Sequence, residues 1–391
     1  MQHPKISRFI RQRCCTLLGV GPMSRNCVDA AIEISNQHDV PLFLVASRQQ
    51  IDAEEFGGGY VNGWTTAEFA RYIQENDSKG GIILARDHGG PWQNNHEVRQ
   101  KHSLRQAMES AKRSYKADIE AGFEFIHIDP STDIWGEPCI DEVLARVFEL
   151  YEHCWAAAKR KNKDIFFEIG AEKQSGDIGA LDEVDYMLSK MRTFCRKNHF
   201  KFPSFVVVQT GTKVAEMKNI GSLGTPFRVA HELPVEIQLP KLVDICNRNN
   251  IFLKQHNTDY LNDDTLSFYP KLGIHSANVA PEFGTRETLA LLDLFDKFGL
   301  AALKERFLRL ALDSGKWDKW MLPETAAGDL EKAVIAGHYV FSSPAFAAIK
   351  EELEKKLKGK IPGVDRYLTE DIKKGLMRYL RNFRLLGLEH L

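Results

Sequence analysis

The sequence has almost no net charge and no apolar stretch of membrane-spanning length. Its 52 lysine and arginine residues nearly balance 53 aspartate and glutamate residues, which leaves a formal charge of −1. Such a balance does not favour binding to nucleic acid or to an anionic membrane surface. Residues 1–15 also lack the apolar core of a signal peptide. We therefore expect neither a nucleic acid nor a membrane as a partner.

Cysteine is scarce and irregularly spaced. The seven cysteines are odd in number, and none of them forms a Cys-x-x-Cys pair. This pattern does not fit a disulfide framework or a structural site built from thiolates. We predict reduced thiols and a cytoplasmic location.

Short apolar runs dominate the first three quarters of the chain. Each is rich in β-branched or aromatic residues and is bounded by polar or glycine-containing turns. The eight runs are 15–21, 41–47, 81–88, 123–129, 164–170, 204–210, 251–256 and 272–279. Near-continuous apolarity indicates strands buried on both faces, and amphipathic helical patterns such as 104–121 and 140–161 lie between them. The alternation predicts an α/β fold, a (β/α)8 TIM barrel.

Two other architectures are less consistent with the sequence. A solenoid would repeat a residue pattern from unit to unit, and none recurs. A doubly wound open sheet would normally carry a glycine-rich phosphate turn after its first strand, and residues 19–24 are too short a match.

The last hundred residues follow a different pattern. Helical spacing covers 301–314, 329–340, 344–358 and 366–386, and no flexible linker precedes it. We expect a barrel over 1–299 and a helical extension over 300–391 packed on it. Aromatic residues of the extension offer surface for the barrel mouth, for a second copy in a homo-oligomer, or for an ordinary core: Trp317, Trp320, Tyr339, Phe341 and Phe346.

Polar side chains collect where the predicted strands end, and in a barrel those ends surround one mouth. Asp87 and His88 lie at the C-terminal end of the third run, and His256 lies at the end of the seventh. Imidazole and oxygen ligands without cysteine suit a divalent metal, most simply zinc, with manganese or another ion as an alternative. The predicted metal ligands are His88, Gln209 and His256. Glu172 and Gln209 are candidates to complete the shell, to orient a ligand or to bind a substrate hydroxyl, with Glu172 also a catalytic candidate.

Other strand-end residues are candidates for binding a substrate: Ser47, Asp129, Glu168, Lys254, Asn278 and Arg286. Period-two alternation places Glu168 deeper than Glu172, where it can pair with Lys254. Such a buried pair would be structural as readily as catalytic.

These residues suggest carbohydrate chemistry. A divalent ion with an open position can polarise a ketone and stabilise the enediolate formed by carbon–carbon cleavage or by proton removal beside the carbonyl. Asp87 is then placed to take a hydroxyl proton and return it. We expect epimerisation or aldol cleavage of a ketose or ketose phosphate.

Several motifs also resemble a known family. They include Asp87-His-Gly-Gly-Pro91 and His256-Asn-Thr-Asp-Tyr260, and further similar stretches lie at 57–65, 122–129, 168–172 and 207–211. The chain is similar to the non-catalytic subunit family of class II tagatose-bisphosphate aldolase and to related ketose and tagaturonate epimerases. The resemblance implies a barrel related to metal-dependent aldolases, with roles for Asp87, His88 and His256.

Two departures weaken the likeness to an ordinary bisphosphate aldolase. Gln209 stands where those aldolases usually have a metal-binding histidine, and Asn257-Thr-Asp259 replaces their glycine-rich phosphate turn. A phosphate could instead bind at Gly284-Thr-Arg286 if a helix begins there, although Thr285 is also an ordinary helix cap. Two functions stay open: a metal-dependent enzyme, or a subunit that stabilises and activates a separate aldolase catalytic subunit.

Overall fold

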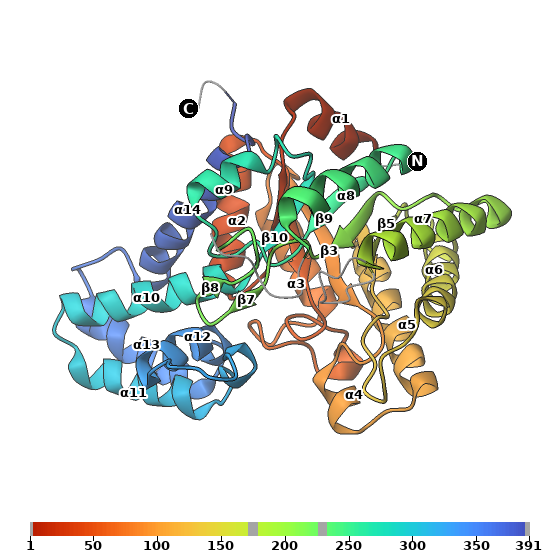
Figure 1. The fold of residues 1–391 in the computed structure, drawn as a ribbon. Helices are drawn as coiled ribbons and strands as arrows, with labels where there is room; N and C mark the ends of the chain where they lie inside the picture. The colour runs from red at the N-terminus through yellow and green to blue at the C-terminus, as the bar shows by residue number, and fades with distance from the viewer. Residues whose placement is uncertain (1–2, 171–178, 226–232, 388–391) are drawn as a thin grey trace.

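A computed structural model of the chain describes residues 3–170, 179–225 and 233–387. Its centre is a closed barrel of eight parallel strands (Figure 1). The barrel strands are β1 (Leu17–Val20), β2 (Leu42–Ala46), β3 (Ile82–Gly89), β4 (Phe125–Ile128), β5 (Phe166–Gly170), β6 (Phe205–Val208), β9 (Phe252–Gln255) and β10 (Ser276–Val279). Each strand pairs with its neighbour in this order, and β10 closes on β1. The predicted TIM barrel is confirmed: seven predicted runs contain a strand, and the run 81–88 overlaps β3 except for Gly89.

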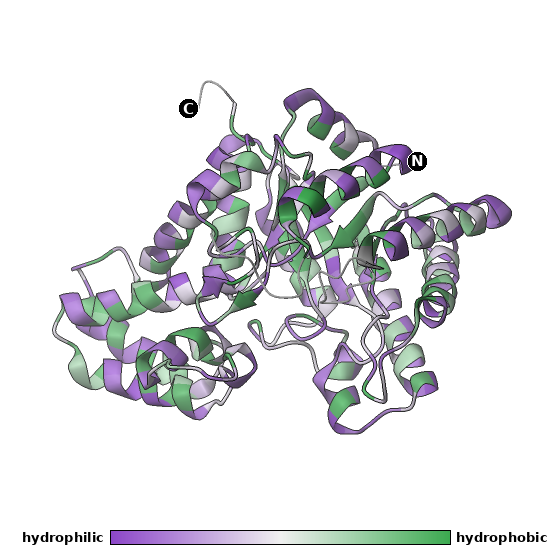
Figure 2. Cartoon of the chain, in the orientation of Figure 1, coloured by the Kyte–Doolittle hydropathy of each residue, from purple (hydrophilic) through white to green (hydrophobic). Residues whose placement is uncertain are grey.

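Helices on the outside cover the barrel. They are α2 (Arg25–His38), α3 (Thr66–Asn76), α4 (Asn95–Arg99), α5 (Leu104–Ala121), α6 (Ile140–Arg160), α7 (Gly179–Asn198), α8 (Val235–Asn249), α9 (Asp263–Phe268) and α10 (Pro281–Lys297), and α1 (Pro4–Arg13) precedes β1. Their apolar faces turn inward and their charged faces outward, as the alternating colours of Figure 2 show. Helix α5 illustrates the local signals, because a Ser103–Gln106 capping box starts it and Gly122, at φ 99°, ends it.

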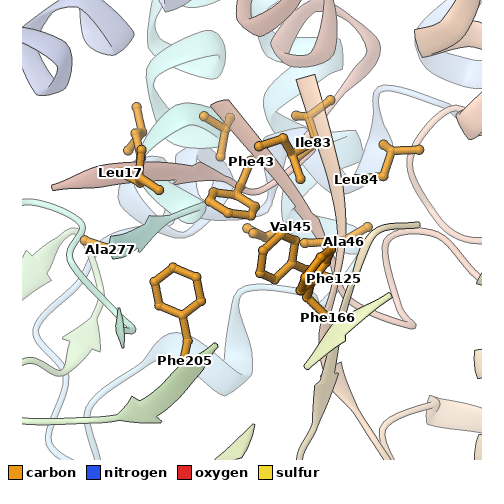
Figure 3. Packing of buried hydrophobic residues seen from close by; sticks show 14 of the residues in the cluster. Leu17, Phe43, Val45, Ala46, Ile83, Leu84, Phe125, Phe166, Phe205 and Ala277 are labelled. Carbon is orange, nitrogen blue, oxygen red and sulfur yellow. The ribbon is translucent and has the colours of Figure 1, made fainter. Parts of the chain in front are cut away.

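Aromatic side chains fill the lower part of the barrel. The rings of Phe43, Phe125 and Phe205 contact one another with centroids 5.0 to 6.2 Å apart, and Figure 3 shows them pointing toward the barrel axis. His3, on the segment before α1, stacks on Phe125 at 5.7 Å. This apolar floor leaves only the upper part of the barrel for polar chemistry.

The C-terminal helices form a lobe beside the barrel (Figure 1). The lobe contains α11 (Ala301–Asp313), the short 3-10 helix η2 (Asp318–Trp320), α12 (Asp329–Val340) and α13 (Pro344–Leu357), whose buried side chains share a core with α10. Helix α14 (Val364–Asn382) returns to pack on α2 and α10, and its residues from Ile372 onward join the barrel core. The proposed division at residue 299 therefore separates parts that pack on each other: α10, before it, shares a core with the lobe helices, and α14, after it, joins the barrel core.

Two further predictions concern the chain as a whole. All seven cysteines carry free thiols, and five of them are buried, which confirms the predicted absence of disulfides. Among the described helices, none has the length and apolarity required to span a bilayer.

Candidate active site at the barrel mouth

A cavity of about 260 Å³ opens at the C-terminal ends of the barrel strands. Strand-end residues from four parts of the barrel line it together with residues of the C-terminal lobe. The lining residues include Ser47, Gln49, Gln50, Tyr60, Asp87, His88, Gln93, His256, Asn257, Asp259, Asn278, Lys319, Trp320 and Tyr339. Five predicted site residues therefore share one cavity: Ser47, Asp87, His88, His256 and Asn278.

An irregularity in β3 turns both Asp87 and His88 toward this cavity. Arg86 pairs with Ile126 of β4, but Gly89 pairs with Ile128, so Asp87 and His88 together lie opposite His127 alone. This is a β-bulge, and His88 adopts the left-handed backbone conformation at φ 43°. Adjacent residues of a regular strand would point to opposite faces, so the bulge is what brings carboxylate and imidazole to one site.

Three imidazoles surround the Asp87 carboxylate. His256 Nε2 lies 3.4 Å from Asp87 Oδ1, His127 Nδ1 lies 3.9 Å from the same oxygen, and His88 Nε2 lies 3.9 Å from Oδ2. The rings of His88 and His256 approach to 4.7 Å between centroids. Ligand atoms of Asp87, His127 and His256 all lie within 4.8 Å of one another, close enough to bind one ion. His256 is thus a predicted metal ligand that belongs to this group, whereas His127 was not among the predicted ligands and the predicted ligand His88 lies beside the group rather than in it.

Hydrogen bonds set the orientation of two of the imidazoles. His88 Nδ1 lies 3.1 Å from Asp129 Oδ2, so a proton on Nδ1 donates to this carboxylate and leaves the Nε2 lone pair on the side of Asp87. His127 Nδ1 accepts the backbone N–H of His88 at 3.2 Å, so its lone pair is already engaged. His88 Nε2 is therefore better prepared to coordinate an ion than His127 Nδ1.

The electrostatics of the cluster favour ionised carboxylates. Burial raises the pKa of Asp87, but the electrostatic interaction with the neighbouring His88 and His256 imidazoles and a hydrogen bond with His127 lower it more, so this pKa lies well below its ordinary value. Burial also opposes ionisation of Asp129, yet the hydrogen bond from His88 and the charge of His127 lower its pKa to about 2. Both carboxylates consequently remain negative near neutral pH.

Below the cluster lies the predicted pair of Glu168 and Lys254. Lys254 Nζ donates to both carboxylate oxygens at 2.8 and 2.9 Å, and each side chain is only 1% exposed. Lys254 Nζ also lies 5.2 Å from the centre of the Phe43 ring. The pairing is confirmed, and the two side chains sit between the phenylalanine floor and the imidazoles rather than in the cavity lining.

Asn278 links the eighth barrel strand to the cluster. Its Nδ2 donates to Asp87 Oδ1 at 3.1 Å. A side chain at Gly19 on the neighbouring strand would place its Cβ 2.2 Å from Asn278 Oδ1, so the absence of a side chain there leaves room for Asn278. Ser47 lines the cavity, and its backbone N–H donates to Gln50 Oε1 at 2.9 Å.

The structure directs two predicted residues away from the cavity. Gln209 Nε2 donates to the carbonyl of Thr212 at 2.7 Å, within its own loop. Arg286 pairs with Asp371 of α14 at 3.0 Å, because α10 begins at Pro281 and places Arg286 on a later turn. The predicted phosphate site at Gly284-Thr-Arg286 consequently lacks exposed helix-terminal amides, which corrects our expectation that a helix starts there. Glu172 lies outside the described residues.

Asp259 occupies the helix start that we had assigned to residues 284–286. Its Oδ1 accepts the backbone N–H groups of Ala280 and Glu282, both at 2.9 Å. Burial, together with the nearby Glu282 carboxylate, raises the pKa of Asp259 to about 7. A carboxylate already satisfies the amides at this terminus, so the start of α10 does not offer an anion site.

Sequence patterns did not identify every residue of the cavity. Gln49, Gln50 and Gln93 lie in loops after strands, where single-sequence periodicity carries no signal. Lys319, Trp320 and Tyr339 come from the C-terminal lobe, forty or more residues beyond the last strand. The aromatic residues of that region were the one available indication, since covering the mouth was among their expected roles.

Comparisons with known proteins agree with this architecture. Residues 8–194, just under half of the chain, match a family model described as D-tagatose-1,6-bisphosphate aldolase subunit GatZ/KbaZ-like. The crystal structure of a probable tagatose 6 phosphate kinase from Sinorhizobium meliloti 1021 matches 94% of this chain and 100% of its own, with 20% identity and a TM-score of 0.73.

Two further structures share the fold at lower identity. The fructuronate-tagaturonate epimerase UxaE from Cohnella laeviribosi, solved with glycerol, matches 94% of this chain and 81% of its own, with 11% identity and a TM-score of 0.58. Fructose-bisphosphate aldolase from Campylobacter jejuni matches 98% and 94%, with 12% identity and a TM-score of 0.54. At these identities the likeness shows the barrel fold alone.

Proposed function

Residues 8–194 carry the signature of the GatZ/KbaZ-like family of tagatose-bisphosphate aldolase subunits, and from this premise we propose that the chain is a metal-dependent carbohydrate enzyme. It would epimerise or aldol-cleave a ketose or ketose phosphate. The observation that carries the proposal is the convergence of His88 and His256 on the Asp87 carboxylate inside a cavity at the barrel mouth. The aldolase from Campylobacter jejuni and the epimerase from Cohnella laeviribosi have a similar fold.

The donor set fits a divalent metal. The Asp87 carboxylate and the imidazole nitrogens of His127 and His256 lie within 4.8 Å of one another, with His88 beside them, and such donors suit zinc, with manganese or a similar ion as the alternative. We assign His88 and His256 as ligands, because the Asp129 hydrogen bond orients His88 in the manner typical of metal-binding histidines. An ion bound here would polarise a substrate carbonyl oxygen. Asp129 is thus proposed as a positioning residue rather than a substrate contact.

Asp87 is the proposed acid–base residue. Its side chain is 15% exposed at the cavity surface, whereas His127 behind it is fully buried. Asn278 donates to Oδ1, which leaves Oδ2 to accept a proton from a substrate hydroxyl and to return it later. Gln49, Gln50 and Gln93 provide amide groups that suit the remaining hydroxyls of a sugar.

The enzyme proposal is tested with the purified full-length chain. We expect about one divalent ion per chain after metal loading and turnover of at least one substrate among ketoses, ketose phosphates and keto-uronates. Asp87→Asn should abolish turnover while leaving the melting temperature and metal content near those of the parent. Asp133→Asn serves as a matched control, because Asp133 pairs with Arg146 and lies outside the cavity lining. Full activity of Asp87→Asn would exclude Asp87 as the base.

A second function is favoured by the description of the matched family as an aldolase subunit. In that case the chain would stabilise and activate a separate aldolase catalytic subunit in the cytoplasm. The discriminating result is turnover that appears only after an aldolase catalytic subunit is added and that is unaffected by Asp87→Asn. Analytical ultracentrifugation of the chain alone would also establish whether it forms a homo-oligomer.

A further inference from the structure

The C-terminal lobe contributes one wall of the cavity. This wall, which we call the C-terminal wall, consists of Lys319, Trp320 and Tyr339. Trp320 Nε1 donates to the Tyr339 hydroxyl at 3.2 Å, so the two aromatic side chains hold each other in place. The lobe therefore does more than cover the barrel, because its side chains border the same space as Asp87 and His256.

Hydrogen bonds anchor the C-terminal wall to two barrel loops. The backbone N–H of Glu216, in the turn between β7 (Val214–Ala215) and β8 (Lys218–Asn219), donates to the Trp320 carbonyl at 2.7 Å. Ser342 Oγ donates to the Tyr60 carbonyl at 2.8 Å, and the Tyr60 and Tyr339 rings lie 4.7 Å apart. Contacts on both sides place the wall in a fixed position relative to the barrel, as a preformed binding surface requires.

Lys319 brings the positive charge of this wall. Among the residues given above as lining the cavity, it is the only lysine or arginine. Its Nζ lies 4.9 Å from the centre of the Trp320 ring and 5.5 Å from that of Tyr339. Within the described ranges 3–170, 179–225 and 233–387, no carboxylate lies within ion-pair distance of Lys319, although Asp87 and Asp259 line the same cavity. Aromatic faces hold the side chain while its N–H donors stay available.

The buried side chain behind the C-terminal wall, His338, does not add a second positive charge to that of Lys319. His338 is 1% exposed, and its ring lies 4.0 Å from that of Tyr339. Burial lowers the pKa of His338 to about 3, and the Lys319 charge lowers it in the same direction. His338 is therefore neutral near pH 7, and Lys319 is the cation that the wall presents.

We propose that Lys319 is a specificity-determining residue that binds an anionic group, a phosphate monoester or a carboxylate, on the substrate. The inference rests on the proposed carbohydrate function and assigns to the lobe a part of substrate recognition that barrel motifs do not contain. Charge-assisted hydrogen bonds to phosphate or carboxylate are stronger than neutral ones. Lys319 is exposed, so solvent weakens the interaction relative to a buried pair.

The test uses three probes with one carbon skeleton: fructose 6-phosphate, fructuronate and fructose. Calorimetric titration of the zinc-loaded full-length protein should show tighter binding of at least one anionic probe than of fructose. Lys319→Gln should weaken that anionic probe about tenfold, the effect of one charge-assisted hydrogen bond, and leave fructose and zinc binding unchanged. Lys319→Arg should retain most of the affinity. The phosphate and carboxylate arms identify which anion the wall selects.

Lys332→Gln is the matched control, because Lys332 lies over Trp317 at 4.8 Å and is absent from the cavity lining. The inference is overturned if the three probes bind alike or not at all, or if Lys319→Gln weakens fructose as much as the anionic probes. Its failure is distinguishable from failure of the enzyme proposal. A protein that binds an anionic probe through Lys319 but turns over no ketose would contradict only the latter.

Discussion

Replacing Asp129 by asparagine tests the orientation of His88 most directly. Asp129 is 2% exposed and accepts hydrogen bonds on both oxygens: Oδ2 from His88 Nδ1 at 3.1 Å, and Oδ1 from Ser131 through its hydroxyl at 2.5 Å and its backbone N–H at 3.3 Å. An asparagine has a single acceptor oxygen. If that oxygen stays with the two Ser131 donors, the amide NH2 turns toward His88 Nδ1.

The consequence for His88 follows from proton positions. An NH2 group facing Nδ1 favours the tautomer with a lone pair on Nδ1 and a hydrogen on Nε2, which cannot coordinate an ion through Nε2. Loss of a partner behind a metal ligand typically weakens metal affinity by about 10- to 100-fold. Because the tautomer itself is reversed here, we expect Asp129→Asn near the upper figure, about 2.7 kcal/mol of binding free energy.

Competition between the protein and a chromophoric zinc chelator at pH 7.5 measures this loss. The pKa of Asp129 is lowered to about 2, so the parent carboxylate is ionised at the assay pH and the comparison is between fixed protonation states. Asp133→Asn should retain parent affinity. An Asp129→Asn protein with an intact fold and zinc affinity within about twofold of the parent would refute the orienting role of Asp129, since loss of a group that orients a metal ligand costs about tenfold or more.

Three other predictions concern buried positions of the barrel and of the helices around it. Lys254→Met leaves Glu168 buried and unpaired, so we expect the free energy of unfolding, measured with urea, to fall by about 3–5 kcal/mol. A Lys254→Met/Glu168→Leu double variant should recover most of this free energy. A single variant as stable as the parent would contradict the structural role of the pair. Gly170→Ala would place a Cβ 2.7 Å from His127 Nε2, which requires the His127 imidazole to move. We expect weaker zinc binding by calorimetry, and an unchanged zinc affinity would contradict this prediction. Burial raises the pKa of Glu287 from 4.5 to about 7, so its contribution to folding stability is present below pH 4.5 and is lost as the pH rises through 7. Glu287→Gln should therefore flatten the dependence of melting temperature on pH across that window. A profile identical to that of the parent would exclude Glu287 as the source of the dependence.

The strands were predictable because burial on both faces produces a signal that short windows can detect. All eight predicted runs overlap barrel strands, and the run 81–88 differs from β3 by one residue at each end. The same periodicity gave the Glu168–Lys254 pair, since inward-facing residues of a parallel barrel meet at known depths. Local apolar patterning thus suffices for the frame of the site.

The bulge in β3 could not be predicted in the same way. Nothing in the sequence between Arg86 and Gly89 signals that two residues will oppose His127 alone, and His88 carries no glycine-like signature for its left-handed conformation. The prediction that Arg286 lies at the start of a helix was wrong for a related reason. Helix α10 starts at Pro281, before the expected start at 284–286, because Asp259, distant in sequence, accepts the N–H groups of Ala280 and Glu282.

The two layers of the barrel interior differ in a way that bears on the choice between enzyme and passive subunit. The floor is closed by Phe43, Phe125 and Phe205, which is the packing that stability alone would favour. The upper layer instead holds a carboxylate among imidazoles, and His88 adopts a backbone conformation that typically costs about 1–3 kcal/mol. Neither feature improves a surface for docking another subunit, because the cluster lies inside the mouth. Such an arrangement makes physical sense when a ligand binds there, so we favour the proposal that this chain binds a ligand at its mouth whether or not it also assists a partner.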